Sequence, residues 1–210
     1  IIYSNHEVGM RDLIINQAMM KIKNNTSYDK TKLLEIKYGL SSLYLTITKI
    51  IVILGINLII NTFKECLLFL LMFSILRLTS FGVHTKKSYQ CWISSIIIFT
   101  LVPYLIKNYN FNINIIYIIS LISFVNICLF APADTEKRPL INKKKRIIFK
   151  IVSIISSLIY IFVIFLLQNA YVTSLLFYSL VLDAIVISPV TYKLFGVKYN
   201  NYRNYRERRI

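Results

Sequence analysis

The chain has 210 residues, of which 56% are hydrophobic, and its formal net charge at neutral pH is +16. This composition is too apolar for a soluble domain and too evenly apolar for a protein with one anchor, so it indicates a polytopic membrane protein. The basic excess alone would suit a nucleic-acid binder, but the Lys and Arg residues flank apolar stretches and have no polar domain to organise them. Nucleic acid is therefore not an expected partner.

The segment 1–41 is polar and charged, and it lacks the early apolar core and small-residue cleavage site of a cleavable signal peptide. Apolar residues recur at helical spacing between positions 8 and 22. They predict an amphipathic helix that lies on the cytoplasmic membrane surface or packs on the bundle. Turn-forming residues follow at 24–28, and a second short helix is predicted from Lys30 to Tyr38, ahead of Gly39.

Six later windows approach the roughly 20 residues that a helix needs to cross a bilayer. They lie near Leu43–Ile60, Glu65–Ser80, Cys91–Ile106, Ile113–Phe130, Ile147–Leu167 and Tyr171–Pro189. The second and third windows are short, so a pair of half-spanning segments stays open there. Pro103 and Pro189 are expected to bend or end their helices.

Basic residues alternate between the two sides of these windows. The first segment carries six, and the alternate connections and the tail carry three, seven and six, which gives 22 on one side; the other side holds Lys64 and Lys107. The positive-inside rule then predicts an all-α, six-span membrane bundle with cytoplasmic termini. The predicted division is a cytoplasmic amphipathic segment 1–41, a transmembrane domain 42–192 and a basic cytoplasmic tail 193–210.

The connection between the second and third windows brings His84 and Cys91 to the expected cytoplasmic surface, and a thiolate with a nearby base can act as a nucleophile. On a regular helix seven residues advance about 10.5 Å, so a working pair needs a bend within 81–87, which Gly82 allows. If the next helix starts near Ser88, its N-terminal N–H groups and two neighbouring lysines favour the thiolate of Cys91. The alternative is a chance spacing of one His and one Cys without chemistry.

With these residues the chain resembles the accessory gene regulator protein B family, the membrane peptidases of Gram-positive quorum sensing. The residues that carry the resemblance are, in order, Arg77, Phe81-Gly82-Val83-His84-Thr85, Cys91, Pro103-Tyr104 and the stretch from Ala131 to Pro139. The chain departs from the usual family pattern where Phe81 precedes Gly82 and where Thr85 follows His84.

The resemblance implies that 42–192 is a cysteine endopeptidase domain in which Cys91 attacks a peptide bond of a short propeptide. His84 would act first as the base and then as the acid for the leaving amine. An internal Cys or Ser of the propeptide would then attack the S-acyl enzyme and close a thiolactone or lactone ring. The resemblance also implies a homodimer in the bacterial cell membrane, with the active site facing the cytoplasm and no cofactor.

Two further groups are candidate substrate-binding residues. The basic run consists of Lys143, Lys144, Lys145 and Arg146. It is predicted to bind the acidic C-terminal tail of such a propeptide, or to act as a topology signal that touches anionic lipid. Asp183 is the one acid well inside a predicted span, which makes it a functional candidate. It is predicted to orient His84 or line the substrate cavity, unless it is protonated or held by a structural hydrogen bond.

Several alternatives stay open. Cys128, near the inner end of the fourth window, is a rival nucleophile, whereas Cys66 falls at the outer end of the second; both suit small buried apolar positions. Six spans would equally fit a small transporter or peptide exporter, in which Asp183 and Lys49 would be the pathway charges. A membrane scaffold without chemistry is the third interpretation, and under it neither His84 nor Cys91 would matter.

Overall fold

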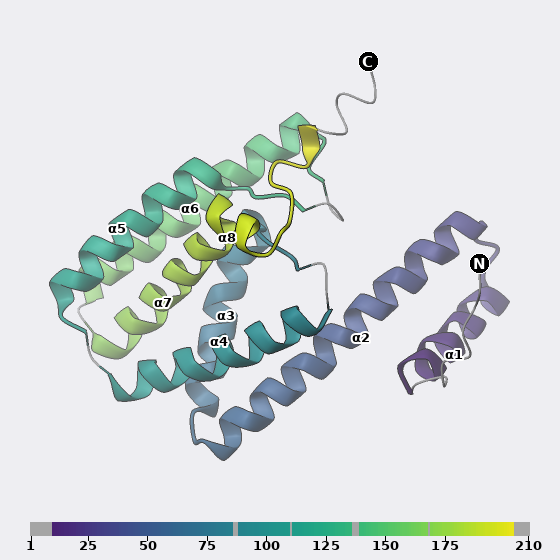
Figure 1. Cartoon of the computed structure of the whole chain (residues 1–210), viewed down its shortest axis with the longest axis horizontal. Helices are drawn as coiled ribbons and strands as arrows, with labels where there is room; N and C mark the ends of the chain where they lie inside the picture. The colour runs from purple at the N-terminus through teal and green to yellow at the C-terminus, as the bar shows by residue number, and fades with distance from the viewer. Residues whose placement is uncertain (1–9, 86–87, 110, 136–138, 168, 204–210) are drawn as a thin grey trace. The chain divides into compact units, whose positions relative to one another are not determined.

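The computed structural model of the chain describes residues 10–85, 88–109, 111–135, 139–167 and 169–203 (Figure 1). Those residues contain eight α-helices: α1 Met10–Asn25, α2 Lys30–Ile59, α3 Phe63–Ser80, α4 Ser88–Asn108, α5 Ile113–Phe130, α6 Lys143–Leu167, α7 Ala170–Ile187 and α8 Pro189–Leu194. The chain divides into two compact units, Ile1–Ile53 and Leu54–Ile210, and the division falls within α2.

The first unit holds α1 and most of α2. The predicted helix near the N-terminus is confirmed as α1, and its location on the membrane surface stays a prediction. The carboxylate of Asp29 accepts the backbone N–H of Lys30 at 2.7 Å, which satisfies a donor at the start of α2. The predicted short helix that ends before Gly39 is wrong, because α2 runs through this residue without a break. A glycine costs a helix only about 1 kcal/mol relative to alanine, and the long apolar run that follows Gly39 keeps the helix continuous.

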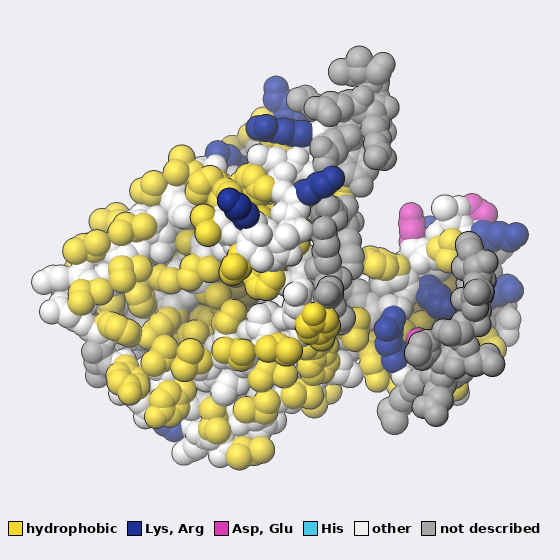
Figure 2. All heavy atoms as spheres, in the orientation of Figure 1, with side chains coloured by type: hydrophobic (Ala, Val, Ile, Leu, Met, Phe, Trp, Pro, Cys, Tyr) yellow, Lys and Arg dark blue, Asp and Glu magenta, His cyan; other side chains and the backbone are white. Residues whose placement is uncertain are grey.

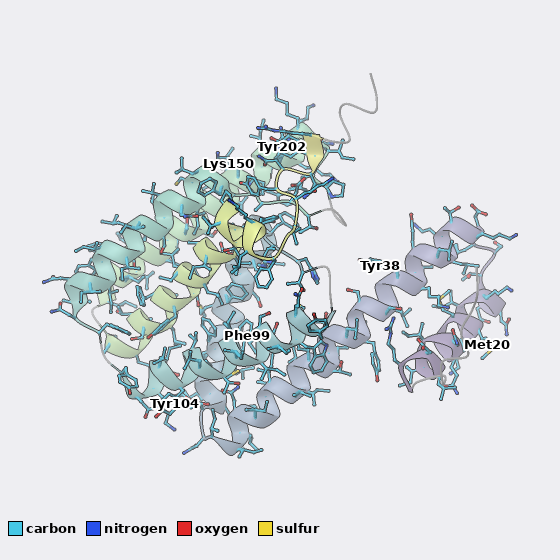
Figure 3. The ribbon with its side chains drawn as sticks, in the orientation of Figure 1. Met20, Tyr38, Phe99, Tyr104, Lys150 and Tyr202 are labelled. Atoms are coloured by element: carbon cyan, nitrogen blue, oxygen red, sulfur yellow. The ribbon has the colours of Figure 1, made fainter. Side chains whose placement is uncertain are left out.

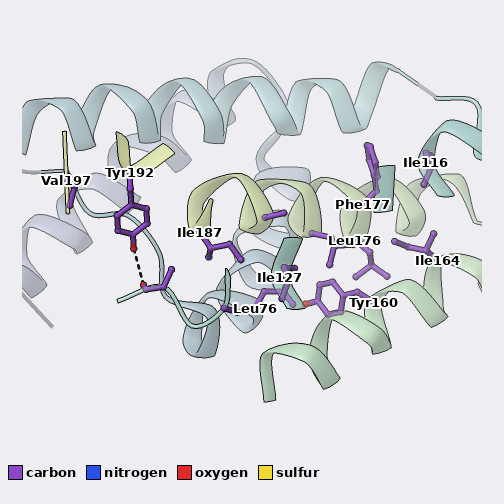
Figure 4. Packing of buried hydrophobic residues seen from close by; sticks show 14 residues of the cluster. Leu76, Ile116, Ile127, Tyr160, Ile164, Leu176, Phe177, Ile187, Tyr192 and Val197 are labelled. Carbon is purple, nitrogen blue, oxygen red and sulfur yellow. Dashed lines mark hydrogen bonds between the residues drawn. The ribbon is translucent and has the colours of Figure 1, made fainter. Parts of the chain in front are cut away.

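The second unit is a helical bundle in which α7 is the central member. More than half of the apolar window of α7 is buried, at 56%, compared with 22% in α5 and in α6. The core around α7 includes Leu76 from α3, Ile127 from α5 and Ile164 from α6 (Figure 4). Most of the other helix surface is apolar and exposed, as expected for helices that face lipid (Figure 2).

Polar side chains join the helices inside this apolar bundle. The hydroxyl of Tyr160 on α6 donates to the carbonyl of Met72 on α3 at 2.9 Å. Two turns closer to the end of α3, the hydroxyl of Ser153 donates to Oγ1 of Thr79, also at 2.9 Å. Such hydrogen bonds and the close approach that small residues allow hold helices together where both lipid and side chains are apolar. They fix α6 against α3 next to the end of α3 that precedes His84.

The helix ends follow local capping chemistry. The side chains of Asn112 and Asn169 accept backbone N–H groups at the starts of α5 and α7. Ser188 caps α8, and Pro189 occupies the first turn of that helix, so the sixth predicted span ends where expected. Pro103, in contrast, does not end its helix, because α4 continues to Asn108.

Five of the six predicted spans, α2, α4, α5, α6 and α7, are long and apolar enough to cross a membrane. α3 carries Lys64, Glu65 and Arg77 in 18 residues, and its length of about 27 Å is close to the thickness of the hydrocarbon core. Both α3 and α4 are single continuous helices. The prediction of an all-α, multi-pass membrane bundle is confirmed, and the count of six spans and the side on which the termini lie stay predictions.

Candidate functional site

The candidate site is built on the segment that leaves α3 and carries His84. Phe81 has φ +58° and Gly82 has φ +111°, so the chain turns away from the helix axis directly after Ser80. The predicted bend before Cys91 is confirmed here, and α4 begins at Ser88, as the sequence indicated. The lysines at 86 and 87, which were expected to favour the Cys91 thiolate, lie outside the described residues.

Backbone hydrogen bonds fix this segment against two other parts of the chain. The N–H of Gly82 donates to the carbonyl of Ala133 at 2.8 Å, and the N–H of Ala133 donates to the carbonyl of Ser80 at 2.8 Å. The N–H of Val83 donates to the carbonyl of Val186 at the end of α7, at 3.0 Å. The segment before His84 is therefore held from the α5–α6 connection on one side and from α7 on the other.

Arg77, in the last turn of α3, contacts the same segment through its guanidinium. Its Nη2 donates to the carbonyl of Val83 at 3.0 Å. Its Nη1 lies against Gly82: a Cβ added to this glycine would be 2.1 Å from Nη1 and 2.9 Å from the carbonyl oxygen of Val186. Glycine is thus required at 82 both for the positive φ and for the close approach of the guanidinium.

Asp183 on α7 is fully buried and faces the same polar cluster. Its Oδ1 accepts the hydroxyl of Ser80 at 2.7 Å, and its charge interacts with the guanidinium of Arg77. Asp183 Oδ2 and Arg77 Nη1 are buried without a hydrogen-bond partner among the described residues. A buried arginine needs a counter-charge, and Asp183 is the carboxylate that supplies it. Of the roles predicted for Asp183, the structure shows a structural hydrogen bond, and its orientation of His84 or contact with substrate stays a prediction.

The predicted base lies in the segment that follows the bend at Gly82, and the predicted nucleophile lies at the start of α4. His84 is exposed and Cys91 is half-buried in the first turn of α4. Arg77 also interacts electrostatically with Cys91, more weakly than with Asp183 or Tyr192.

The predicted basic run forms the start of α6. Arg146 stacks over the ring of Tyr202 from the C-terminal segment, with its guanidinium carbon 3.8 Å from the ring centre. Figure 3 labels Tyr202 and, on α6, Lys150. Arg146 also interacts electrostatically with Asp134 of the α5–α6 connection. Lys143, Lys144 and Lys145 are exposed. Binding of an acidic peptide by this run stays a prediction.

The C-terminal segment folds back onto the α5–α6 connection through side chains that the sequence did not single out. The hydroxyl of Tyr192 donates to the carbonyls of Ala133 and Asp134 at 3.0 and 2.9 Å (Figure 4). Burial raises the pKa of Asp134, although three backbone N–H groups that donate to its carboxylate oppose this rise. Burial likewise raises the pKa of Tyr199 to about 12. Ser80, Asp134 and Tyr192 were missed because nothing in their spacing along the chain reveals these contacts.

The other two cysteines differ in burial. Cys66 is fully buried, and its thiol donates to the carbonyl of Phe99 at 3.4 Å. Cys128 is half-buried near the end of α5, where it stays a rival nucleophile. Among the described residues, no group of three His, Cys, Asp or Glu side chains could hold a metal ion.

The fold and the site together define a helical, multi-pass membrane protein. A half-buried cysteine lies at a helix start, and a buried arginine interacts with it electrostatically. The chain belongs to the Accessory gene regulator B family, whose family model matches residues 15–187. That family connects the chain to the accessory gene regulator system of quorum sensing.

Curated relatives match the chain over nearly its whole length. An AgrB-like protein of Listeria monocytogenes is 31% identical over 196 residues, which cover 93% of this chain and 93% of the relative. An AgrB-like protein of Clostridium acetobutylicum is 30% identical over 87% of this chain and 88% of its own. The accessory gene regulator protein B of Staphylococcus aureus is 27% identical over 84% of this chain and 93% of its own. No solved structure matches the chain.

Proposed function

We propose that the protein is a membrane cysteine endopeptidase that removes the C-terminal part of a short signalling propeptide and promotes its cyclisation. The observation that carries this proposal is the placement of Cys91 in the first turn of α4, within electrostatic range of the buried Arg77. Backbone hydrogen bonds hold the residues directly before His84, the proposed base. Membership in the Accessory gene regulator B family supports the substrate class.

The proposed reaction has two acyl transfers. His84 takes the proton of the Cys91 thiol, and the thiolate attacks the carbonyl carbon of the scissile peptide bond. The bond to the leaving amine breaks as His84 returns the proton to that nitrogen, which leaves an S-acyl enzyme. A thiol or hydroxyl of the propeptide then attacks the same carbonyl, loses its proton to His84 and restores the Cys91 thiol. The product is a cyclic thiolactone or lactone.

The polar cluster under the turn has a defined part in this scheme. Arg77 stabilises the negative charge on the Cys91 sulfur, and Asp183 compensates the arginine when the sulfur is neutral or acylated. Asp183 is then a positioning residue rather than a group that touches substrate. The exposed lysines at the start of α6 suit an acidic peptide tail, because oppositely charged side chains attract it to the mouth of the site.

The proposal includes a location and an assembly. The basic residues at the ends of α3, α6 and α8 favour a cytoplasmic site in the bacterial cell membrane, since cytoplasmic connections carry the excess of Lys and Arg. A homodimer is expected from the resemblance to the family.

The test is mass spectrometry of a tagged candidate propeptide that is co-expressed with the wild-type protein, Cys91→Ala, Cys91→Ser or His84→Ala. The proposal predicts that only the wild type releases the C-terminal tail. Normal cleavage by Cys91→Ala would leave Cys128 as the nucleophile, which Cys128→Ala in the same assay would reveal. If no variant changes cleavage but Cys91→Ala impairs peptide export, the protein is a transporter.

A further inference from the structure

The C-terminal segment reaches the backbone that carries His84 through one buried hydroxyl. Tyr192 on α8 is 1% exposed, and its hydroxyl donates to the carbonyl of Ala133 at 3.0 Å. The same carbonyl accepts the N–H of Gly82 at 2.8 Å. Two donors from distant parts of the chain thus converge on the Ala133 oxygen, and one of these donors, the N–H of Gly82, lies only two residues before His84 along the chain. A displacement of Ala133 would therefore move the turn that presents His84.

Asp134 locks the chain that follows Tyr192 onto the same connection. Its side chain is 2% exposed, and its Oδ1 accepts the N–H of Asn201 at 2.9 Å. Its Oδ2 accepts the N–H of Tyr202 at 2.8 Å and that of Leu140 at 3.3 Å. Three backbone donors on one carboxylate close a loop between the α5–α6 connection and the last described residues. An amide side chain cannot reproduce this arrangement, because its nitrogen donates instead of accepting.

We infer that Tyr192 and Asp134 are positioning residues for the proposed reaction, and that they act through Ala133 on the turn that carries His84. This inference rests on the proposed function, in which His84 moves a proton at the Cys91 sulfur. A reacting group that is displaced by about 1 Å can lose about a hundredfold in rate. Both side chains are buried, away from the surface where a propeptide would bind, so the proposed brace sets turnover and leaves substrate binding unchanged.

The test compares Tyr192→Phe with Tyr199→Phe, which removes the same atom from a neighbouring tyrosine. The Tyr199 hydroxyl donates to the carbonyl of Phe130 at 3.2 Å, away from Ala133, and its ring packs on that of Tyr192 with centroids 5.1 Å apart. Both variants keep their rings, so both should fold. Purified full-length protein in detergent is assayed for hydrogen exchange of the backbone amides at 80–85. Cleavage of a tagged candidate propeptide is measured in parallel.

Loss of the Tyr192 hydroxyl is expected to raise the exchange rate of the Gly82 amide about tenfold and to lower kcat about tenfold or more, with KM within about twofold of the wild type. Tyr199→Phe should leave both readouts near the wild-type values. Asp134→Asn should follow Tyr192→Phe, because it releases the chain after α8 from the same connection. A rise in KM that is larger than the fall in kcat would overturn the inference, since it would indicate a substrate-binding role.

The proposed function and the role of Tyr192 and Asp134 are tested by separate outcomes. If the wild type does not cleave the propeptide at all, the proposed function fails, and the exchange data still test whether Tyr192 holds the turn. If the wild type cleaves but Tyr192→Phe matches Tyr199→Phe in exchange and in kcat, the brace is refuted and the proposed function stands. Faster exchange at Gly82 with an unchanged kcat would also refute it, because the turn would then not need its fixed position.

Discussion

Gly82→Ala is the substitution for which the structure makes the sharpest prediction. The backbone there has φ +111°, a conformation that costs an L-residue about 1–3 kcal/mol. The added Cβ would be 2.1 Å from Nη1 of Arg77 and 2.9 Å from the backbone carbonyl of Val186. The guanidinium would have to move and lose its hydrogen bond to Val83, which is worth about 1.5–3 kcal/mol for a charged donor. The total of about 3–6 kcal/mol approaches the whole stability of an ordinary domain.

Two other glycines allow the backbone cost to be measured apart from the cost of displacing the guanidinium. Gly55 lies in α2 with no atom within 4 Å of an added Cβ, so Gly55→Ala should stabilise the helix by up to about 1 kcal/mol. Gly196 has φ +61° and an equally open surrounding, so Gly196→Ala should lose only the backbone cost of about 1–2 kcal/mol. The expected order of stability is Gly55→Ala, then Gly196→Ala, then Gly82→Ala.

The assay is thermal unfolding of the detergent-purified protein, followed by size-exclusion chromatography, with propeptide cleavage measured on the fraction that stays folded. We expect Gly82→Ala to melt far below the other two and to lose cleavage even where it is folded, because Arg77 no longer holds the carbonyl of Val83, next to His84. A Gly82→Ala protein that melts with Gly196→Ala and cleaves normally would refute the packing argument around the guanidinium.

Three further predictions concern the polar contacts of the second unit. Asp183→Asn should keep the bond from Ser80 but leave Arg77 without a counter-charge, with a loss of about 2 kcal/mol in the same melting assay. Alkylation of Cys91 by iodoacetamide at pH 7 should become faster, because the uncompensated guanidinium attracts the thiolate more strongly; an unchanged alkylation rate would contradict the electrostatic link. Burial raises the pKa of Asp134, so the folded state binds more protons than the unfolded chain between about pH 3.9, the ordinary pKa, and the raised pKa. The protonated Asp134 therefore contributes stability at lower pH, and this stability is lost as the pH rises through that window. The difference in melting temperature between the wild type and Asp134→Asn should shrink as the pH rises through this window. A difference that grows with pH would contradict the raised pKa of Asp134. Tyr160→Phe should cost about 1 kcal/mol through its lost bond to α3, measured by thermal melting, with cleavage unchanged.

The sequence by itself determined the membrane class, the helical character and most of the helix bounds. These features depend on local physics: apolar runs of spanning length, capping Asn and Ser residues, and Lys and Arg at alternate ends. The fifth element illustrates this, since the predicted span Ile113–Phe130 is the helix found as α5. The bend at Gly82 and the helix start before Cys91 were predictable for the same reason. The predicted helix end before Gly39 is wrong because one glycine destabilises a helix less than the apolar run after it stabilises it.

Only the tertiary structure decided which side chains support the candidate site. Ser80 and Asp183 are far apart in the sequence, as are Ala133 and Tyr192, and each pair meets because α3, α5 and α7 end at the same level of the bundle. Periodicity describes how a helix distributes its own faces, but it carries no information on which partner each face meets. In an apolar interior an unpaired polar group is costly, so the fold determines the partners of Arg77 and Asp183, and with them the surroundings of Cys91.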